Sequence, residues 1–579
     1  MQEIDPSILQ KAQKWLAGNY DVDTKSQVKK LIDNYPNELT EAFYRDLEFG
    51  TGGLRGIMGV GTNRMNKYTV AIATQGLANY LKKSFPSQKI KVAIAYDCRN
   101  NSNFFAQVSA DVLSANDIIV YLFDELRPTP ELSFAVRQLQ CQSGIVITAS
   151  HNPKEYNGYK VYWDDGGQLI HPHDVNVITE VQKIKEIEDV NFEKKSENIF
   201  FIGNKIDDEY IAKIKTLSLS PEIIQKHNDL KIVYTPIHGT GYRLAPLALK
   251  EFGFTNVITV DEQMITDGNF PTVKSPNPEE AAALNLALEK AKQTNAEILM
   301  GTDPDADRVG IAIRNNQNEF VLLNGNQTAS LLIYYLLNAW KEKNKILGKE
   351  YIVKTIVTSE LLREMANHFG VECFDVLTGF KYIADSIKRN EGSKTFIGGG
   401  EESYGYLVGD FVRDKDAVIS CCMIAETAAW AKENGKTMYQ LLIDIYSEFG
   451  FYKETLLSVT KKGKEGAEEI QAMMTAYRTN PPIAIAGSKV IRIADYQLQT
   501  ITDCVINAQA IPTGQPKSNV LQFFLADGSK ITVRPSGTEP KIKFYFGIKT
   551  ELPDKSKFED INKEVDERIK GIIHEMNLA

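Results

Sequence analysis

Short apolar segments, each followed at once by a polar loop and then by a helical stretch, recur along the chain and constrain its fold more than any other feature. Five of them are predicted as buried strands, over residues 91–96, 144–148, 231–234, 297–300 and 395–397. Helices are expected between them, for example over 279–295 and 327–340. This alternation predicts an α/β class with mixed or mostly parallel sheets. In such sheets the loops after the carboxyl ends of the strands hold the functional residues.

The length of the chain predicts how many such units it contains. Its 579 residues exceed what one compact core holds, and at ~150 residues per domain about four domains are expected. Three segments are candidate domain boundaries: a charged stretch at 193–208, an Asn-Gly-Asn segment at 324–326, and residues 449–454, after which the sequence pattern changes. We therefore expect domains over residues 1–205, 206–325, 326–452 and 453–579, with an error of several residues at each boundary.

Composition excludes several classes of protein. Lys and Arg number 66 against 75 Asp and Glu, a net charge of −9, whereas nucleic acids and anionic membranes bind a basic face. No apolar run approaches the ~20 residues of a membrane-spanning helix. The first residues also lack the basic and apolar regions of a secretion signal. We expect a cytoplasmic monomer or homodimer without nucleic-acid or membrane partners.

An Asp-rich loop after the strand at 297–300 is the strongest chemical signal. The six cysteines show no C-x-x-C spacing and the seven histidines no H-E-x-x-H pair, so a metal site must be built mainly from oxygen. Asp303, Asp305 and Asp307 stand at alternate positions, followed by Arg308. Three such carboxylates can converge on one hard cation, for which Mg²⁺ is the natural candidate. A solvated acidic turn is the alternative. An EF-hand fits poorly because arginines occupy its sixth and twelfth positions.

The loop TASHNP follows the apolar strand at 144–148 and contains a candidate nucleophile. Ser150 could carry a phosphoryl group, or with Asn152 it could merely complete a turn before Pro153. The loop is not a G-x-S-x-G nucleophile elbow, because Thr148 replaces the first glycine. A Ser–His hydrolase is disfavoured, since the adjacent His151 would not usually face the hydroxyl of its neighbour.

Three further loops are suited to anions or to sugar hydroxyls. The segment 50–56 combines glycines with Arg55, and RPSGTEP at 534–540 offers a guanidinium, hydroxyls and a glycine, so its backbone N–H groups can form an anion nest. GGGEESYG at 398–405 presents Glu401 and Ser403, and carboxylates accept paired hydrogen bonds from sugar diols. Each of the three could also be an ordinary turn. Four of these polar loops lie near residues 150, 303, 401 and 534, so each expected domain contains about one.

The ordered set TASHNP, GTDPDADR, GEESYG and RPSGTEP resembles the α-D-phosphohexomutase superfamily, the phosphoglucomutases and phosphomannomutases. The motifs match that family's phosphoserine, metal, sugar and phosphate loops, and the resemblance covers nearly the whole chain. It implies the family fold of three similar mixed-sheet α/β domains and a smaller C-terminal α+β domain around a central cleft. LTGFKYI and the chain length also resemble the phosphoglucomutase-2/phosphopentomutase branch.

The resemblance implies a role for each matching residue. Ser150 would be the phosphorylated carrier and would hold Mg²⁺ through its phosphate, together with Asp303, Asp305 and Asp307. The other residues implied in catalysis are His151, Lys160, Arg308 and Lys415. Lys415 matches a lysine proposed as the general acid or base, although Lys160 and His151 remain candidates for that role. The residues implied in substrate binding are Thr51, Arg55, Thr378, Gly379, Lys381, Glu401, Ser403, Arg534, Ser536, Gly537 and Thr538.

The implied activity is a mutase reaction on small phosphosugars. Glucose 1-phosphate and glucose 6-phosphate would be interconverted through a phosphoserine enzyme and glucose 1,6-bisphosphate, which reorients in the cleft and also activates the enzyme. A phosphopentomutase or a phosphomannomutase with the same mechanism is the alternative, although Tyr404-Gly405 replaces the Gly-His pair common in dual phosphomannomutases. A metal-dependent sugar phosphatase and a non-enzymatic sugar-phosphate binding protein are the alternatives from other classes.

Overall fold

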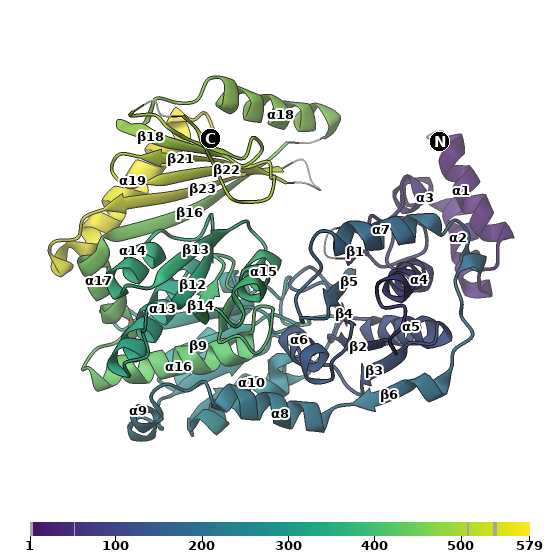
Figure 1. Cartoon of the computed structure of the whole chain (residues 1–579), viewed down its shortest axis with the longest axis horizontal. Helices are drawn as coiled ribbons and strands as arrows, with labels where there is room; N and C mark the ends of the chain where they lie inside the picture. Colours follow the sequence, from purple (N-terminus) through teal and green to yellow (C-terminus); the bar gives the residue numbers. More distant parts are fainter. Residues whose placement is uncertain (1–3, 51–52, 462, 507–508, 537–540, 579) are drawn as a thin grey trace.

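Four β-sheets organise the protein. The computed structural model describes residues 4–50, 53–461, 463–506, 509–536 and 541–578. The chain starts with three helices at the upper right of Figure 1 and passes through the first, second and third sheets. It then forms the fourth sheet, at the upper left, and ends in a helix. Across the described part of the chain, no helix is both long enough and apolar enough to cross a membrane.

The first sheet has the strand order β1-β5-β4-β2-β3-β6. Strands β2, β3, β4 and β6 are parallel, and β5 runs antiparallel to its neighbours β1 and β4. All five residues of β4 are buried, as a continuous apolar run in a sheet covered on both faces predicts. The N-terminal helices α1–α3 share an apolar core with this sheet. The elements are α1 (Pro6–Ala17), α2 (Val22–Asn34), α3 (Pro36–Phe43), β1 (Gly53–Ile57), α4 (Lys67–Ser84), β2 (Lys91–Tyr96), α5 (Ser102–Ala115), β3 (Ile119–Phe123), α6 (Thr129–Gln138), β4 (Ser143–Ile147), β5 (Tyr156–Trp163), α7 (His173–Lys183) and β6 (Ile199–Ile202).

The second and third sheets repeat one feature of the first. Their strand orders are β11-β10-β9-β7-β8 and β13-β12-β14-β15. In each of the three sheets a buried strand leads through a polar loop into an antiparallel partner, as β4–β5, β9–β10 and β14–β15. The elements are α8 (Asn204–Lys215), α9 (Pro221–Lys226), β7 (Ile232–Thr235), α10 (Gly241–Phe252), β8 (Val257–Thr259), α11 (Asp261–Met264), α12 (Asn285–Gln293), β9 (Ile298–Thr302), β10 (Val309–Arg314), β11 (Phe320–Leu322), α13 (Gly325–Glu342), β12 (Glu350–Thr355), α14 (Leu361–Phe369), β13 (Glu372–Val376), α15 (Phe380–Asn390), β14 (Thr395–Gly400), β15 (Tyr406–Val408), α16 (Ala417–Glu433) and α17 (Met438–Phe449).

The fourth sheet differs from the others because all its strand pairs are antiparallel. Its order is β16-β23-β22-β21-β18-β19-β20, with β17 paired to β18. The helices α18 and α19 pack against it. The elements are β16 (Phe451–Thr460), α18 (Gly463–Thr479), β17 (Ala484–Ile485), β18 (Ser488–Asp495), β19 (Thr500–Asp503), β20 (Ile511–Pro512), β21 (Leu521–Leu525), β22 (Lys530–Pro535), β23 (Lys541–Thr550) and α19 (Phe558–Glu575).

The five predicted strands are confirmed as β2, β4, β7, β9 and β14, but two other expectations are wrong. The helix predicted over 279–295 is a short 3₁₀ turn at Ala281–Leu284 followed by α12. The residues before this turn pack against β10. The carbonyl oxygen of Pro278 lies so close to Gly310 that a Cβ added to Gly310 would be 2.3 Å from that oxygen. The stretch 193–208, predicted as a linker, contains the edge strand β6 and the start of α8. The three domain boundaries stay predictions.

Candidate active site

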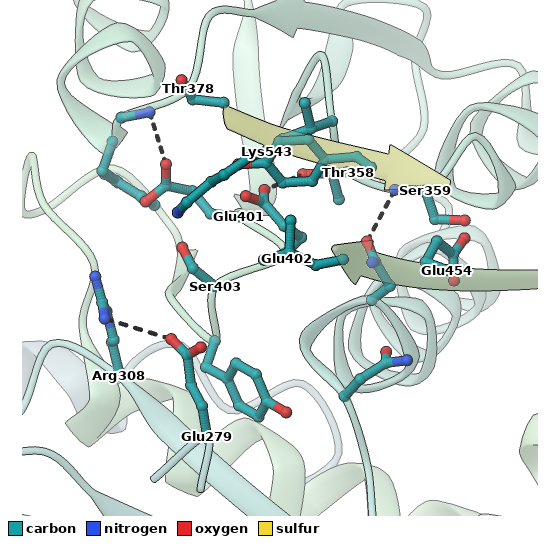
Figure 2. Close-up of a pocket in the computed structure, with 18 of the residues that line it drawn as sticks. Glu279, Arg308, Thr358, Ser359, Thr378, Glu401, Glu402, Ser403, Glu454 and Lys543 are labelled. Atoms are coloured by element: carbon teal, nitrogen blue, oxygen red, sulfur yellow. Dashed lines mark hydrogen bonds and ion pairs between the residues drawn. The ribbon is translucent and has the colours of Figure 1, made fainter. Parts of the chain in front are cut away.

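A cavity of about 620 Å³ is lined by residues of all four sheets or of the loops that join their strands. It is lined by β1, by the loops after β4, β9, β12 and β14, and by strands of the fourth sheet. Figure 2 shows side chains from several of these elements, among them Arg308, Glu401 and Lys543, pointing into one space. Twelve residues proposed from the sequence line it: Arg55, Ser150, His151, Lys160, Asp307, Arg308, Thr378, Gly379, Glu401, Ser403, Lys415 and Arg534.

Ser150 lies in the loop between β4 and β5 in an unusual backbone conformation. Its φ of 52° is in the left-handed region that residues with a Cβ rarely adopt, and such strain clusters at functional sites. Its Oγ donates a hydrogen bond to Oδ2 of Asp303 at 2.8 Å and lies 3.2 Å from Nδ1 of His151. The expectation that the adjacent histidine would not face this hydroxyl is therefore wrong, because the left-handed turn brings the two side chains together.

Arg99, which the sequence analysis missed, holds this loop in place. Its side chain is buried and donates to the carbonyl oxygens of Ser150 at 2.6 Å, Pro153 at 2.8 Å and Tyr156 at 3.1 Å. Asp97 Oδ2 lies 3.3 Å from its Nε. The only sequence signal was an Asp-x-Arg directly after a buried strand. The parallel pairing of β2 with β4 decides which loop that arginine reaches.

The carboxylates of Asp303, Asp305 and Asp307 converge in the loop between β9 and β10. One oxygen from each lies within 4.8 Å of the others, and all three side chains are buried. Oδ1 of Asp305 and Oδ1 of Asp307 are buried and have no hydrogen-bond partner among the described residues. A solvated acidic turn is excluded by this burial. Converging carboxylate oxygens with unused acceptor capacity fit a hard divalent cation such as Mg²⁺.

Two lysines offset part of the negative charge. Lys160 Nζ lies 2.8 Å from Asp305 Oδ2 and 3.3 Å from Asp307 Oδ2, and Lys415 Nζ lies 3.1 Å from Asp307 Oδ2. Burial, reinforced by the neighbouring aspartates, raises the pKa of Asp303 well above its usual range. Burial acts in the same direction on Asp305, but the ammonium of Lys160 outweighs it and the pKa of Asp305 is lowered. Burial is thus the largest single influence on both pKa values, and the nearby lysine charge decides that the two shifts have opposite directions.

Arg308, His151 and Arg55 surround the serine. Arg308 Nη1 contacts Nδ1 of His151, and Arg55 Nη1 donates to Oδ1 of Asn152 at 3.3 Å. Burial, together with the charges of Arg308 and Arg55, lowers the pKa of His151 to about 2. The imidazole is therefore neutral, and its Nδ1 lies between the hydroxyl of Ser150 and a permanent cation.

The loop between β14 and β15 presents Glu401 and Ser403 to the cavity (Figure 2). Glu401 Oε1 accepts a hydrogen bond from the backbone N–H of Gly379 at 2.8 Å, which joins this loop to the start of α15. Glu402 accepts instead from Oγ1 of Thr355 on β12 at 3.0 Å. The second glutamate thus anchors the loop to its sheet, and the first faces the cavity with its pKa raised by burial.

The remaining proposed residues do not all line the main cavity. Arg534 lines the cavity beside Lys543 of β23, a cation that the sequence analysis missed. Lys381 lies in the first turn of α15 and lines a neighbouring cavity of about 290 Å³, which shares Gln168 with the main cavity. Its role in substrate binding stays a prediction. Ser536 is described but is not among the lining residues. Thr51, Gly537 and Thr538 lie outside the described residues.

Comparison with known proteins identifies the family. Models of the phosphoglucomutase/phosphomannomutase alpha/beta/alpha domains I, II and III and of the C-terminal domain match residues 46–188, 208–316, 324–449 and 459–568. The chain belongs to the phosphoglucomutase/phosphomannomutase family. Two similar members are phosphoglucomutases of Staphylococcus haemolyticus, 38% identical over 535 residues, and Staphylococcus aureus, 40% identical over 538 residues. Both alignments cover 92% of this chain and 94% of the relative.

A solved structure of this family has the same fold. Parafusin from Paramecium, an exocytosis-sensitive phosphoprotein and phosphoglucomutase solved in its open form, superimposes with a TM-score of 0.69 at 19% identity. The match covers 92% of this chain and 96% of that chain. The predicted fold class is therefore confirmed: three α/β domains followed by a C-terminal domain of different architecture.

Proposed function

We propose that this protein interconverts glucose 1-phosphate and glucose 6-phosphate, with Ser150 as the phosphoryl carrier. The observation that carries the proposal is the hydroxyl of Ser150, a residue with a left-handed backbone. It donates a hydrogen bond to Asp303 at 2.8 Å and lines a cavity that Arg534 also lines. The glucose substrate is favoured over mannose or ribose because both curated relatives are named phosphoglucomutases. The enzyme is thus an intramolecular phosphotransferase, an isomerase.

The reaction consists of two phosphoryl transfers with a reorientation between them. Phosphorylated Ser150 gives its group to the 6-hydroxyl of glucose 1-phosphate: the P–Oγ bond breaks, a P–O6 bond forms, and the hydroxyl proton passes to a base. Lys415, Lys160 and His151 are the candidates for that base; His151 is neutral, whereas either lysine would first have to give up its own proton. Glucose 1,6-bisphosphate then turns within the cavity and returns its 1-phosphate to Ser150, which leaves glucose 6-phosphate.

Charge neutralisation is what this transfer needs most. Asp303, Asp305 and Asp307, with a phosphate oxygen on Ser150, would hold Mg²⁺. When bound, the ion would neutralise charge on the transferring group. The positions of the cations of Lys160, Lys415 and Arg308 around the serine support a role in binding the same phosphate.

The sugar and its second phosphate would be held by the other walls of the cavity. Glu401 and Ser403 are suited to sugar hydroxyls, and Thr378 and Gly379 lie beside them. Arg534 with Ser536, Gly537 and Thr538 would bind the phosphate that is not being transferred, and Thr51 and Arg55 would bind substrate from β1. A cytoplasmic location and a monomeric or homodimeric state stay predictions.

The test is a substrate panel combined with removal of the carrier. Wild-type protein with Mg²⁺ and glucose 1,6-bisphosphate is given the 1-phosphates of glucose, mannose, glucosamine and ribose, and the products are identified by NMR. We expect conversion of glucose 1-phosphate without stoichiometric release of inorganic phosphate, and no conversion by Ser150→Ala. Ser196→Ala, at an exposed serine, is the control and should behave as wild type. Stoichiometric phosphate release would identify a phosphatase, and full activity of Ser150→Ala would overturn the carrier role.

A further inference from the structure

Glu279 places a carboxylate in the cavity that none of the four motif loops contains. It lies in the segment before the 3₁₀ turn Ala281–Leu284 and lines the cavity. Its Oε1 is 3.4 Å from Nη1 of Arg308. Figure 2 shows the two side chains pointing toward one another across the lower part of the cavity. A negative charge here is unexpected where an anionic substrate must bind.

Arg308 stands between this carboxylate and the phosphoryl carrier. The same Nη1 that faces Glu279 contacts His151, whose Nδ1 lies 3.2 Å from Oγ of Ser150. The Nε of Arg308 is 3.8 Å from Oδ1 of Asp307. The guanidinium therefore reaches toward the serine from one side and toward Glu279 from the other.

A guanidinium in this position needs an anionic partner at all times. It stays protonated at any working pH, and its side chain is only 18% exposed, so an unpaired state would be unfavourable. Asp307 is a constant neighbour of its Nε, but at 3.8 Å it is beyond hydrogen-bond distance. In a mutase cycle the phosphoryl group leaves Ser150 and returns, so a phosphate cannot be the constant partner of the Nη1 end. A dianionic phosphate attracts a guanidinium more strongly than one carboxylate does.

We propose that Glu279 is a positioning residue that pairs with Arg308 while the phosphoryl group is away from Ser150 and yields it when a phosphate arrives. The inference rests on the proposed function and deepens it. Glu279 competes with the bisphosphate for Arg308, so it weakens bisphosphate binding. By the same competition it helps the bound bisphosphate to detach from Arg308 and reorient.

Binding of glucose 1,6-bisphosphate tests this competition. Calorimetric titrations with Mg²⁺ compare Glu279 with Glu279→Gln in a Ser150→Ala background, which prevents phosphoryl transfer during the measurement. Glu279→Gln should bind about three- to tenfold more tightly, the range expected for loss of a partly screened competing ion pair. With Ser150 restored, kcat should fall by a similar factor. Glu279→Asp, which keeps the charge, should give intermediate values.

The neighbouring residue supplies a matched control. Glu280 is exposed and is hydrogen-bonded to Asn277, so Glu280→Gln should bind bisphosphate as wild type does. Equal or weaker binding by Glu279→Gln at an unchanged melting temperature would overturn the inference and leave the mutase proposal standing. Weaker binding together with a lower melting temperature would assign Glu279 a structural role and also overturn it. If wild-type protein fails to convert glucose 1-phosphate, the proposed function falls and the inference with it.

Discussion

Replacement of Arg99 by lysine should slow turnover strongly and leave substrate affinity almost unchanged. The Arg99 side chain is fully buried, and its guanidinium donates to the carbonyl oxygens of Ser150, Asn152, Pro153 and Tyr156. A lysine would keep a positive charge opposite Asp97. One ammonium group, however, cannot reproduce the planar fork that reaches four carbonyls at once.

The size of the effect follows from these contacts. We expect the loss of about two charge-assisted hydrogen bonds at about 1.5 kcal/mol each, or about 3 kcal/mol in total. The left-handed backbone of Ser150 costs about 1–2 kcal/mol and persists only while its surroundings enforce it. The loss removes about half of the hydrogen bonding that holds this strained conformation, so the loop departs more readily from the position in which Ser150 faces Asp303. If the transition state feels the whole loss, kcat falls about 100-fold.

The assay is the conversion of glucose 1-phosphate, coupled to oxidation of glucose 6-phosphate by its dehydrogenase, at saturating Mg²⁺ and bisphosphate. KM should change little, because the cavity residues Glu401 and Arg534 belong to other sheets. Arg389→Lys is the control, since that side chain is 64% exposed and pairs with Asp385 on its own helix. A kcat of Arg99→Lys within twofold of wild type would refute the reasoning. A loss explained fully by unfolded protein would assign Arg99 to stability and not to positioning.

Two further predictions concern pH and metal. Burial raises the pKa of Glu454 from 4.5 to about 7. The contribution of this group to stability is therefore present below the unfolded pKa and is lost as the pH rises through about 7. Glu454→Gln should raise the melting temperature more at about pH 8 than at about pH 5, and an equal change at both pH values would contradict this. Chelation of divalent cations should abolish activity, and Mg²⁺ should restore it and raise the melting temperature. Asp305→Asn should lose that rise, and a rise equal to that of wild type would exclude Asp305 as a ligand.

The strands and the loops that follow them could be predicted from short segments of the sequence. Ser150, Asp303 and Glu401 each come directly after a short apolar run, and such a run predicts a buried strand because few other environments accept it. The antiparallel return from each of these loops, as β4–β5 and β9–β10, had no comparable signal. It depends on the pairing partner that the chain meets after the turn.

The residues that the sequence missed have a cause in common with those whose surroundings it could not define. Lys381 follows the matching motif in sequence, and only the start of α15 at Phe380 decides that its side chain lines the neighbouring cavity. Arg99 acts on backbone carbonyls, which every residue possesses, so no residue type marks its partners. Glu279 was expected at the start of a helix, but it lies before the 3₁₀ turn, and its Oε1 is 3.4 Å from Nη1 of Arg308.

By itself the sequence determined the α/β class, the family and the chemical groups of the candidate site, because apolar runs and ordered polar motifs are properties of short segments. The tertiary structure decided which of those groups share one cavity and which contacts set their charge. Ser150 and Asp303 are 153 residues apart in the chain and 2.8 Å apart in space. Such a contact depends on how whole sheets pack, and no local pattern contains that information.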